Sequence, residues 1–69
     1  MDQTKIGKFI AELRRDRGMT QEQMAEKLGV SAKSVSRWEN GRNLPDASLF
    51  EPMCELLQIS LTELCAAKG

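Results

Sequence analysis

The sequence predicts an all-α domain, a compact bundle of five short helices, from three observations. Near the amino terminus, apolar residues recur at helical spacing: Ile6, Phe9, Ile10 and Leu13. Twice, a hydroxyl residue precedes Gln or Glu by three positions, the capping box that starts a helix, at Thr20–Gln23 and Ser60–Glu63. Helix-ending signals follow the apolar segments, at Gly18, Gly29 and Asn40-Gly41. Because 69 residues leave room for one small core, we expect a single domain over residues 1–69.

The first three helices follow from these signals in order. The apolar stripe near the amino terminus predicts a helix over about residues 4–17. Thr20 is the N-cap of a second helix, whose buried stripe is expected to be Met24, Ala25 and Leu28. Ser31 is the next N-cap, and it opens a third helix over about residues 32–40.

The spacing of Ala25, Gly29, Val35 and Trp38 indicates how the second and third helices meet. A small residue lets the helices approach closely, and glycine lets the chain leave the second helix sharply. Val35 and Trp38, three positions apart, direct one stripe of the third helix onto the core. This pattern predicts a helix-turn-helix motif over about residues 20–40, in which the second motif helix is the usual element for entering the major groove of DNA.

The remaining sequence predicts two more helices. Pro52 would break an interior hydrogen bond in a helix drawn from residue 46 onward. We therefore expect residues 46–50 to form a loose turn, with Pro52 in the first turn of a fourth helix over about residues 51–58. The capping box at Ser60–Glu63 predicts a short fifth helix that ends near residue 66.

The outward face of the third helix is the candidate base-reading surface. With about 100° of rotation per residue, the direction opposite Val35 and Trp38 carries polar and cationic side chains. Arginine and lysine bond to guanine in the major groove, serine is permissive, and an alanine methyl can touch thymine. The expected base contacts are Ala32, Lys33, Ser36 and Arg37. The competing interpretation is an ordinary solvated helix face.

Contacts to the DNA backbone are expected on either side of that surface. Gln21 lies in the first turn of the second helix, where backbone N–H groups and the helix dipole favour an anion. Asn40 and Arg42, at the end of the third helix, complete the expected phosphate contacts. A plain helix start at Gln21 and a structural cap at Asn40-Gly41 are the alternatives. Separately, Arg14 and Glu39 flank the core and predict a partly buried ion pair.

Charge is balanced in number and polarised along the chain. Lys and Arg number 10, as do Asp and Glu, so the formal net charge is zero. Residues 1–42 carry nine basic and six acidic groups, whereas residues 43–69 carry one basic and four acidic groups. This asymmetry suits one face toward phosphates and another toward solvent or a partner, although a strongly basic balance is the usual footprint of nucleic-acid binding.

Composition excludes several other classes. There is no histidine, and Cys54 and Cys65 alone cannot build a structural zinc site, so no metal or cofactor is expected. Cys54 is interpreted as a small buried hydrophobe. No phosphate-cradling glycine loop or paired nucleophile and base indicates an enzyme. Without a signal peptide or an apolar run of membrane-spanning length, we expect a soluble, cytoplasmic protein with no membrane partner.

The segment from Arg14 to Arg42, RRDRGMTQEQMAEKLGVSAKSVSRWENGR, resembles the phage-repressor (Cro/Xre-type) family of helix-turn-helix regulators. The resemblance implies a lambda-repressor-like five-helix fold and a transcriptional regulator, foremost a repressor, that binds inverted repeats as a dimer. By position, it implies phosphate contacts from Gln21 and Asn40, base contacts on the third helix, and an internal Arg14–Glu39 pair. Family members that read bases often present amides where this chain has Ala32-Lys33, so its operator cannot be copied from a relative.

Other functions stay open at this stage. An antitoxin or adaptor could dock a partner protein through the acidic 43–69 segment. RNA binding is less favoured, because no exposed aromatics are expected for stacking bases. For a homodimer, Leu61 and Leu64 fit either a two-fold interface or a cover for the core. No small-molecule ligand is indicated.

Overall fold

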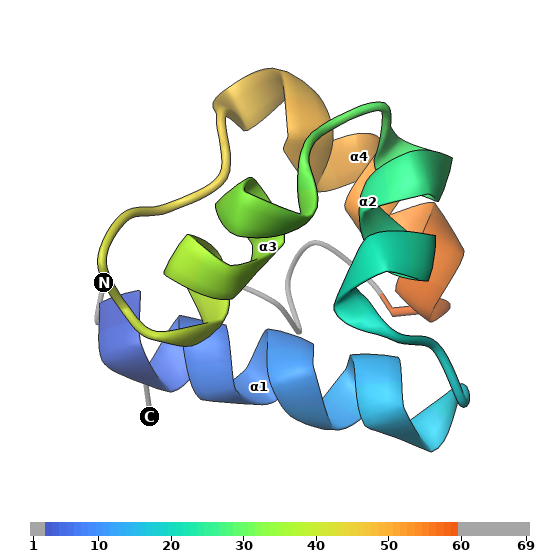
Figure 1. Cartoon of the computed structure of the whole chain (residues 1–69), viewed down its shortest axis with the longest axis horizontal. Helices are drawn as coiled ribbons and strands as arrows, with labels where there is room; N and C mark the ends of the chain where they lie inside the picture. Colours follow the sequence, from blue (N-terminus) through green and yellow to red (C-terminus); the bar gives the residue numbers. More distant parts are fainter. Residues whose placement is uncertain (1–2, 60–69) are drawn as a thin grey trace.

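The computed structural model describes residues 3–59, which form four α-helices and no strand. The helices are α1 (Gln3–Asp16), α2 (Gln21–Leu28), α3 (Ala32–Glu39) and α4 (Ala47–Leu57). α1 runs along one side of the molecule, with α2 and α3 above it, and α4 begins above α3 and passes behind α2 (Figure 1). α3 packs against both α1 and α2, and α4 contacts α2. The all-α class is confirmed, whereas the predicted fifth helix lies outside the described residues.

Every helix contributes to one core. Its largest fully buried side chains come from all four helices: Ile10, Met24, Val35, Met53 and Leu57. Trp38 is 5% exposed and Cys54 8% exposed, so both are core residues as predicted. Within residues 3–59, no helix is long and apolar enough to cross a bilayer.

The caps predicted for α2 and α3 are present. The Thr20 hydroxyl oxygen accepts a hydrogen bond from the backbone N–H of Gln23 at 3.1 Å. In return, the Gln23 side-chain oxygen accepts from the Thr20 N–H at 2.9 Å, which completes the capping box. Ser31 caps α3 by accepting from the N–H of Ser34 at 3.2 Å. The predicted bounds of the first three helices are therefore confirmed to within about one residue at each end.

The predicted start of the fourth helix is wrong. α4 begins at Ala47, and Pro52 lies inside it, where it removes the N–H that would bond to the carbonyl of Ser48. The Asp46 carboxylate caps the helix, accepting from the Ser48 N–H at 3.0 Å and from its hydroxyl at 2.6 Å. Leu49 and Phe50 pack half-buried against the core, each contributing about 1 kcal/mol. Together with the cap, this burial offsets the about 3 kcal/mol that an interior proline costs.

Arg17 joins the carboxyl ends of α1 and α4. Its Nε donates to the backbone carbonyl oxygen of Leu57 at 2.9 Å, and its Nη2 donates to the same oxygen. That carbonyl belongs to the last turn of α4, where the helix itself supplies no donor. A cation at this position also complements the negative end of the α4 dipole.

Candidate nucleic-acid interface

A three-residue turn joins α2 to α3. Gly29 ends α2 with φ 73°, in the left-handed region, and its N–H bonds back to the carbonyls of Ala25 and Glu26. The N–H of Val30 bonds to the carbonyl of Ala25 at 3.0 Å, and Ser31 then caps α3. The chain therefore reverses within residues 29–31, as the spacing of small and apolar residues predicts.

α3 has one buried and one exposed face. Val35 is fully buried and Trp38 nearly so, while Lys33 and Arg37 lie on the exposed side. Neither cationic side chain has a hydrogen bond or ion pair to another residue within 3–59. Ser36 is half-buried, and Ala32 packs partly against the core, so only part of its surface faces outward. Lys33 and Arg37 therefore form the open cationic surface of α3.

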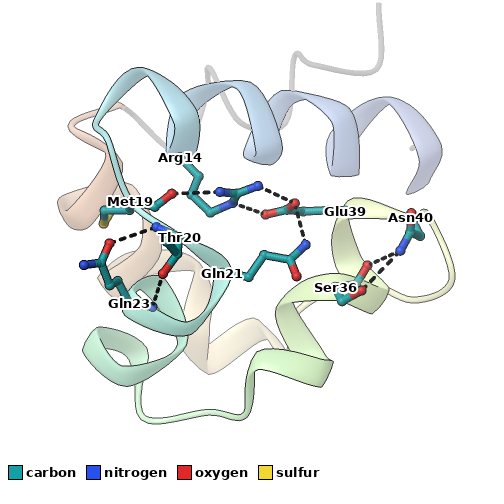
Figure 2. A network of polar contacts seen from close by, with 8 residues as sticks. All are labelled: Arg14, Met19, Thr20, Gln21, Gln23, Ser36, Glu39 and Asn40. Atoms are coloured by element: carbon teal, nitrogen blue, oxygen red, sulfur yellow. Dashed lines mark hydrogen bonds and ion pairs between the residues drawn. The ribbon is translucent and has the colours of Figure 1, made fainter.

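At the end of α3, two candidate DNA contacts are bonded to each other. The Asn40 Nδ2 donates to the backbone carbonyl of Ser36 at 2.9 Å and to its hydroxyl at 3.3 Å (Figure 2). Asn40 is also the C-cap residue of α3. Arg42 follows in the exposed loop, with its backbone N–H bonded to the carbonyl of Arg37 at 2.9 Å. The cap expected as the alternative role of Asn40 is thus present. Its Nδ2 is bonded to Ser36 and its free side-chain oxygen can only accept, whereas the Arg42 guanidinium keeps its donors for an anionic ligand.

The amino end of α2 offers backbone donors. The capping box uses the N–H groups of Thr20 and Gln23. Those of Gln21 and Glu22 have no acceptor within the described part of the chain. Free N–H groups and the positive end of the helix dipole favour an anion at such a helix start.

A buried polar network connects α1, α2 and α3 (Figure 2). Arg14 Nε and Nη2 donate to the two carboxylate oxygens of Glu39 at 2.6 and 3.0 Å. The exposed fractions of the two side chains are only 10% and 6%. Arg14 Nη1 donates to the backbone carbonyl of Met19 at 2.7 Å. The hydrogen bond to Glu39 raises the pKa of Arg14 against the opposing effect of burial, so the guanidinium keeps its charge.

Gln21 belongs to the same network. Its Nε2 donates to Glu39 Oε1 at 3.0 Å, the oxygen that also accepts from Arg14 Nη2. One N–H of the Gln21 amide is therefore committed inside the protein, and the other remains for a ligand. The sequence places Gln21 at the helix start but does not reveal this bond, because it depends on how α2 and α3 cross.

Gly7 is the residue of this region that the sequence reasoning missed. A Cβ at Gly7 would lie 2.1 Å from the carbonyl oxygen of Trp38 and 3.0 Å from that of Glu39. The backbones of α1 and α3 therefore touch here. A glycine inside a helix costs about 1 kcal/mol of stability relative to alanine. The presence of Gly7 next to the apolar stripe of α1 was therefore the signal in the sequence that another backbone approaches closely there.

These features define a helix-turn-helix DNA-binding domain of the kind that transcriptional regulators use: a tight turn, a second motif helix with an open cationic face, and a helix start with free donors. The family model described as helix-turn-helix matches residues 10–64. The chain belongs to this helix-turn-helix family, in its Cro/Xre-type branch.

Named relatives fit this placement. The chain is 36% identical over 61 residues to the cryptic phage CTXphi transcriptional repressor RstR of Vibrio cholerae serotype O1, covering 88% of this chain and 54% of that protein. It is 34% identical over 59 residues to the antitoxin PezA of Streptococcus pneumoniae serotype 4, covering 86% of this chain and 37% of PezA. It therefore spans about half or less of these relatives.

A solved structure of similar length supports the same fold. The restriction-modification controller protein C.AhdI from Aeromonas hydrophila superposes with a TM-score of 0.82 at 28% identity. The alignment covers 91% of each chain. The similarity thus extends over nearly the whole length of the two chains compared.

Proposed function

We propose that this chain binds double-stranded DNA sequence-specifically, as the DNA-binding module of a transcriptional repressor. α3 enters the major groove, and the observation that carries the proposal is the exposure of Lys33 and Arg37 opposite the buried Val35 and Trp38. Because they lie one turn apart on α3, their side chains can reach adjacent base pairs. The module acts by binding, with no catalytic step.

The proposed contacts fall into two groups. Arg37 bonds bidentately to guanine and Lys33 bonds less rigidly, with Ser36 and the exposed part of Ala32 completing the base-reading surface. Gln21 and Arg42 hold phosphates and fix the docking register, and Asn40 joins them by turning its Nδ2 from Ser36 toward the DNA backbone. The free N–H groups at the start of α2 support the phosphate role of Gln21.

We also propose that two copies bind an inverted repeat in the cytoplasm. The proposal rests on the family of the chain, whose members include a named phage repressor. In a two-fold complex the half-sites would lie about 34 Å apart, one helical turn of DNA. Sedimentation with and without the selected duplex tests this assembly, and a monomer under both conditions would reject it.

The deciding experiment is selection from a random duplex pool at about 150 mM salt. We expect enrichment of a guanine-containing inverted repeat by the wild-type protein. Lys33→Glu with Arg37→Glu should abolish that enrichment and leave the far-ultraviolet circular dichroism unchanged, because both side chains are exposed. Failure of folded wild-type protein to enrich any sequence would refute the proposal.

A protein-binding role is the second candidate. The similarity to the antitoxin PezA favours it, as does the acidic excess of residues 43–69, with one basic and four acidic groups. In that case the charge reversal on α3 should leave partner binding intact, whereas reversal of Glu51 and Glu55, exposed on α4, should weaken it.

A further inference from the structure

An open polar groove lies between α1, the start of α2 and the end of α3. Its volume is about 410 Å³, and the buried Arg14–Glu39 pair is part of its lining. Gln21 and Asn40 line it from the motif side. From α1, it is lined by Lys8, Ala11, Glu12 and Arg15. Two of the residues that line the groove, Gln21 and Asn40, are therefore ones for which a phosphate contact is already proposed.

The charges in the groove favour an anion. Arg14 and Glu39 neutralise each other, which leaves the exposed side chains of Lys8, Arg15 and Glu12. Lys8 and Arg15 have no hydrogen bond or ion pair to any residue of the described segment. The groove thus carries one excess positive charge, and the free N–H groups at the start of α2 add a positive dipole end.

We propose that this groove binds the phosphate backbone of DNA, with Lys8 and Arg15 of α1 as additional phosphate ligands and Glu12 as a residue that weakens the contact. A strand whose phosphates reach Gln21 and Asn40 passes the open side of the same groove. The long, unpaired side chains of Lys8 and Arg15 can then follow the backbone without disturbing the fold. The inference rests on the proposed DNA binding and adds α1 to the interface.

The test measures how affinity for the selected duplex depends on salt. Each lost phosphate contact should reduce the slope of log K against log salt by about 0.9. We expect this reduction for Lys8→Gln and for Arg15→Gln, with affinity weakened about two- to fivefold at about 150 mM salt. Glu12→Gln should strengthen binding. The matched control is Lys27→Gln, which removes the same charge from an exposed position of α2 outside this groove.

A second measurement separates a bound phosphate from a general charge effect. Duplexes in which single phosphates are replaced by neutral methylphosphonates are compared with the wild-type protein and with Arg15→Gln. At the phosphate that Arg15 contacts, the substitution should weaken wild-type binding and have no further effect on the variant. Equal effects on both proteins at every position would overturn the inference.

The two proposals fail in distinguishable ways. If folded wild-type protein enriches no duplex, the proposed function is wrong and α1 has no DNA ligand to hold. If wild-type binds its selected duplex but Lys8→Gln and Arg15→Gln behave like Lys27→Gln, DNA binding stands and the role of α1 is refuted.

Discussion

The backbone of Gly7 on α1 lies against the carbonyl oxygen of Trp38 on α3, so closely that a Cβ at Gly7 would lie 2.1 Å from that oxygen. Real Cβ atoms do not approach a carbonyl oxygen to this distance, and neither partner is a flexible side-chain end. The distance between α1 and α3 is thus set by direct contact of their backbones. The same contact fixes the position of the proposed DNA-binding surface relative to α1.

Gly7→Ala should therefore destabilise the domain, although alanine is the better helix former. Moving α3 away from α1 costs about 1–3 kcal/mol, more than the about 1 kcal/mol that helix propensity returns. Urea unfolding should show a lower midpoint for Gly7→Ala than for wild-type protein. Lys8→Ala, one position along on the exposed side, is the control and should change the midpoint little. Equal or greater stability of Gly7→Ala would contradict the contact.

Glu39→Ala should lower the melting temperature by several degrees or more. It leaves the Arg14 guanidinium buried with only the Met19 carbonyl as acceptor, and it also removes the acceptor of Gln21. Breaking a buried pair costs about 3–5 kcal/mol, and we expect the lower part of this range because the groove admits water. Thermal unfolding followed by circular dichroism measures the change, and an unchanged curve would refute the role of the pair.

The cap of α4 predicts an acid-sensitive contribution to stability. Hydrogen bonds from Ser48 lower the pKa of the Asp46 carboxyl below its ordinary value. Because the folded-state pKa is depressed, the contribution is fully present above the unfolded-state value of about 3.9 and is lost as the pH falls through the lower folded-state value. Melting from about pH 2 to 7 should therefore show a smaller difference between wild-type protein and Asp46→Ala at the acid end. A difference that stays constant across this range would contradict the titration.

Pro52→Ala should stabilise the domain. Alanine restores the N–H that can bond to the Ser48 carbonyl, and Pro52 is exposed, so little packing is lost. The gain of up to about 3 kcal/mol is reduced by about 1 kcal/mol through the greater freedom of the unfolded chain. Chemical denaturation should show a net increase of about 2 kcal/mol. Pro45→Ala, at a buried loop position, should instead lower stability, and a less stable Pro52→Ala would show that α4 depends on the proline.

Arg37→Lys should relax base specificity more than it weakens DNA binding. Lysine keeps the charge but loses the two-pronged contact with guanine, which is worth about 1–3 kcal/mol of discrimination. Competition between the selected duplex and one with a single guanine replaced measures the effect. Arg42→Lys, at a proposed phosphate contact, should change the affinity for both duplexes equally. If Arg37→Lys distinguished the two duplexes as well as the wild-type protein does, the contact with this guanine would have to be made by another residue.

Local signals accounted for most of α1, α2 and α3. The capping box at Thr20 and the cap at Ser31 act within one turn of their own helices, so the sequence carries them directly. The stripe through Val35 and Trp38 likewise follows from helix geometry alone. The buried and exposed faces of α3 could therefore be assigned before its position in the fold was known.

The errors and omissions have a different origin. The sequence predicts the wrong start for α4 because the rule against interior proline does not include the packing of Leu49 and Phe50, which stabilises the first turns of the helix. The contact of Gly7 with Trp38 and the bond from Gln21 to Glu39 both depend on how separate helices cross. No pattern within a single helix specifies those distances.

The bond between Arg17 and the last turn of α4 gives the domain a mechanical property. Force on the chain just beyond α4 would act on the contact between the Leu57 carbonyl and the Arg17 guanidinium as well as on the buried Leu57 side chain. The load would pass from there into α1, and from α1 to α3 through the backbone contact at Gly7. Part of any tension on the carboxyl side of this domain would thus reach the helix proposed to read DNA by a route that bypasses the turn between α2 and α3.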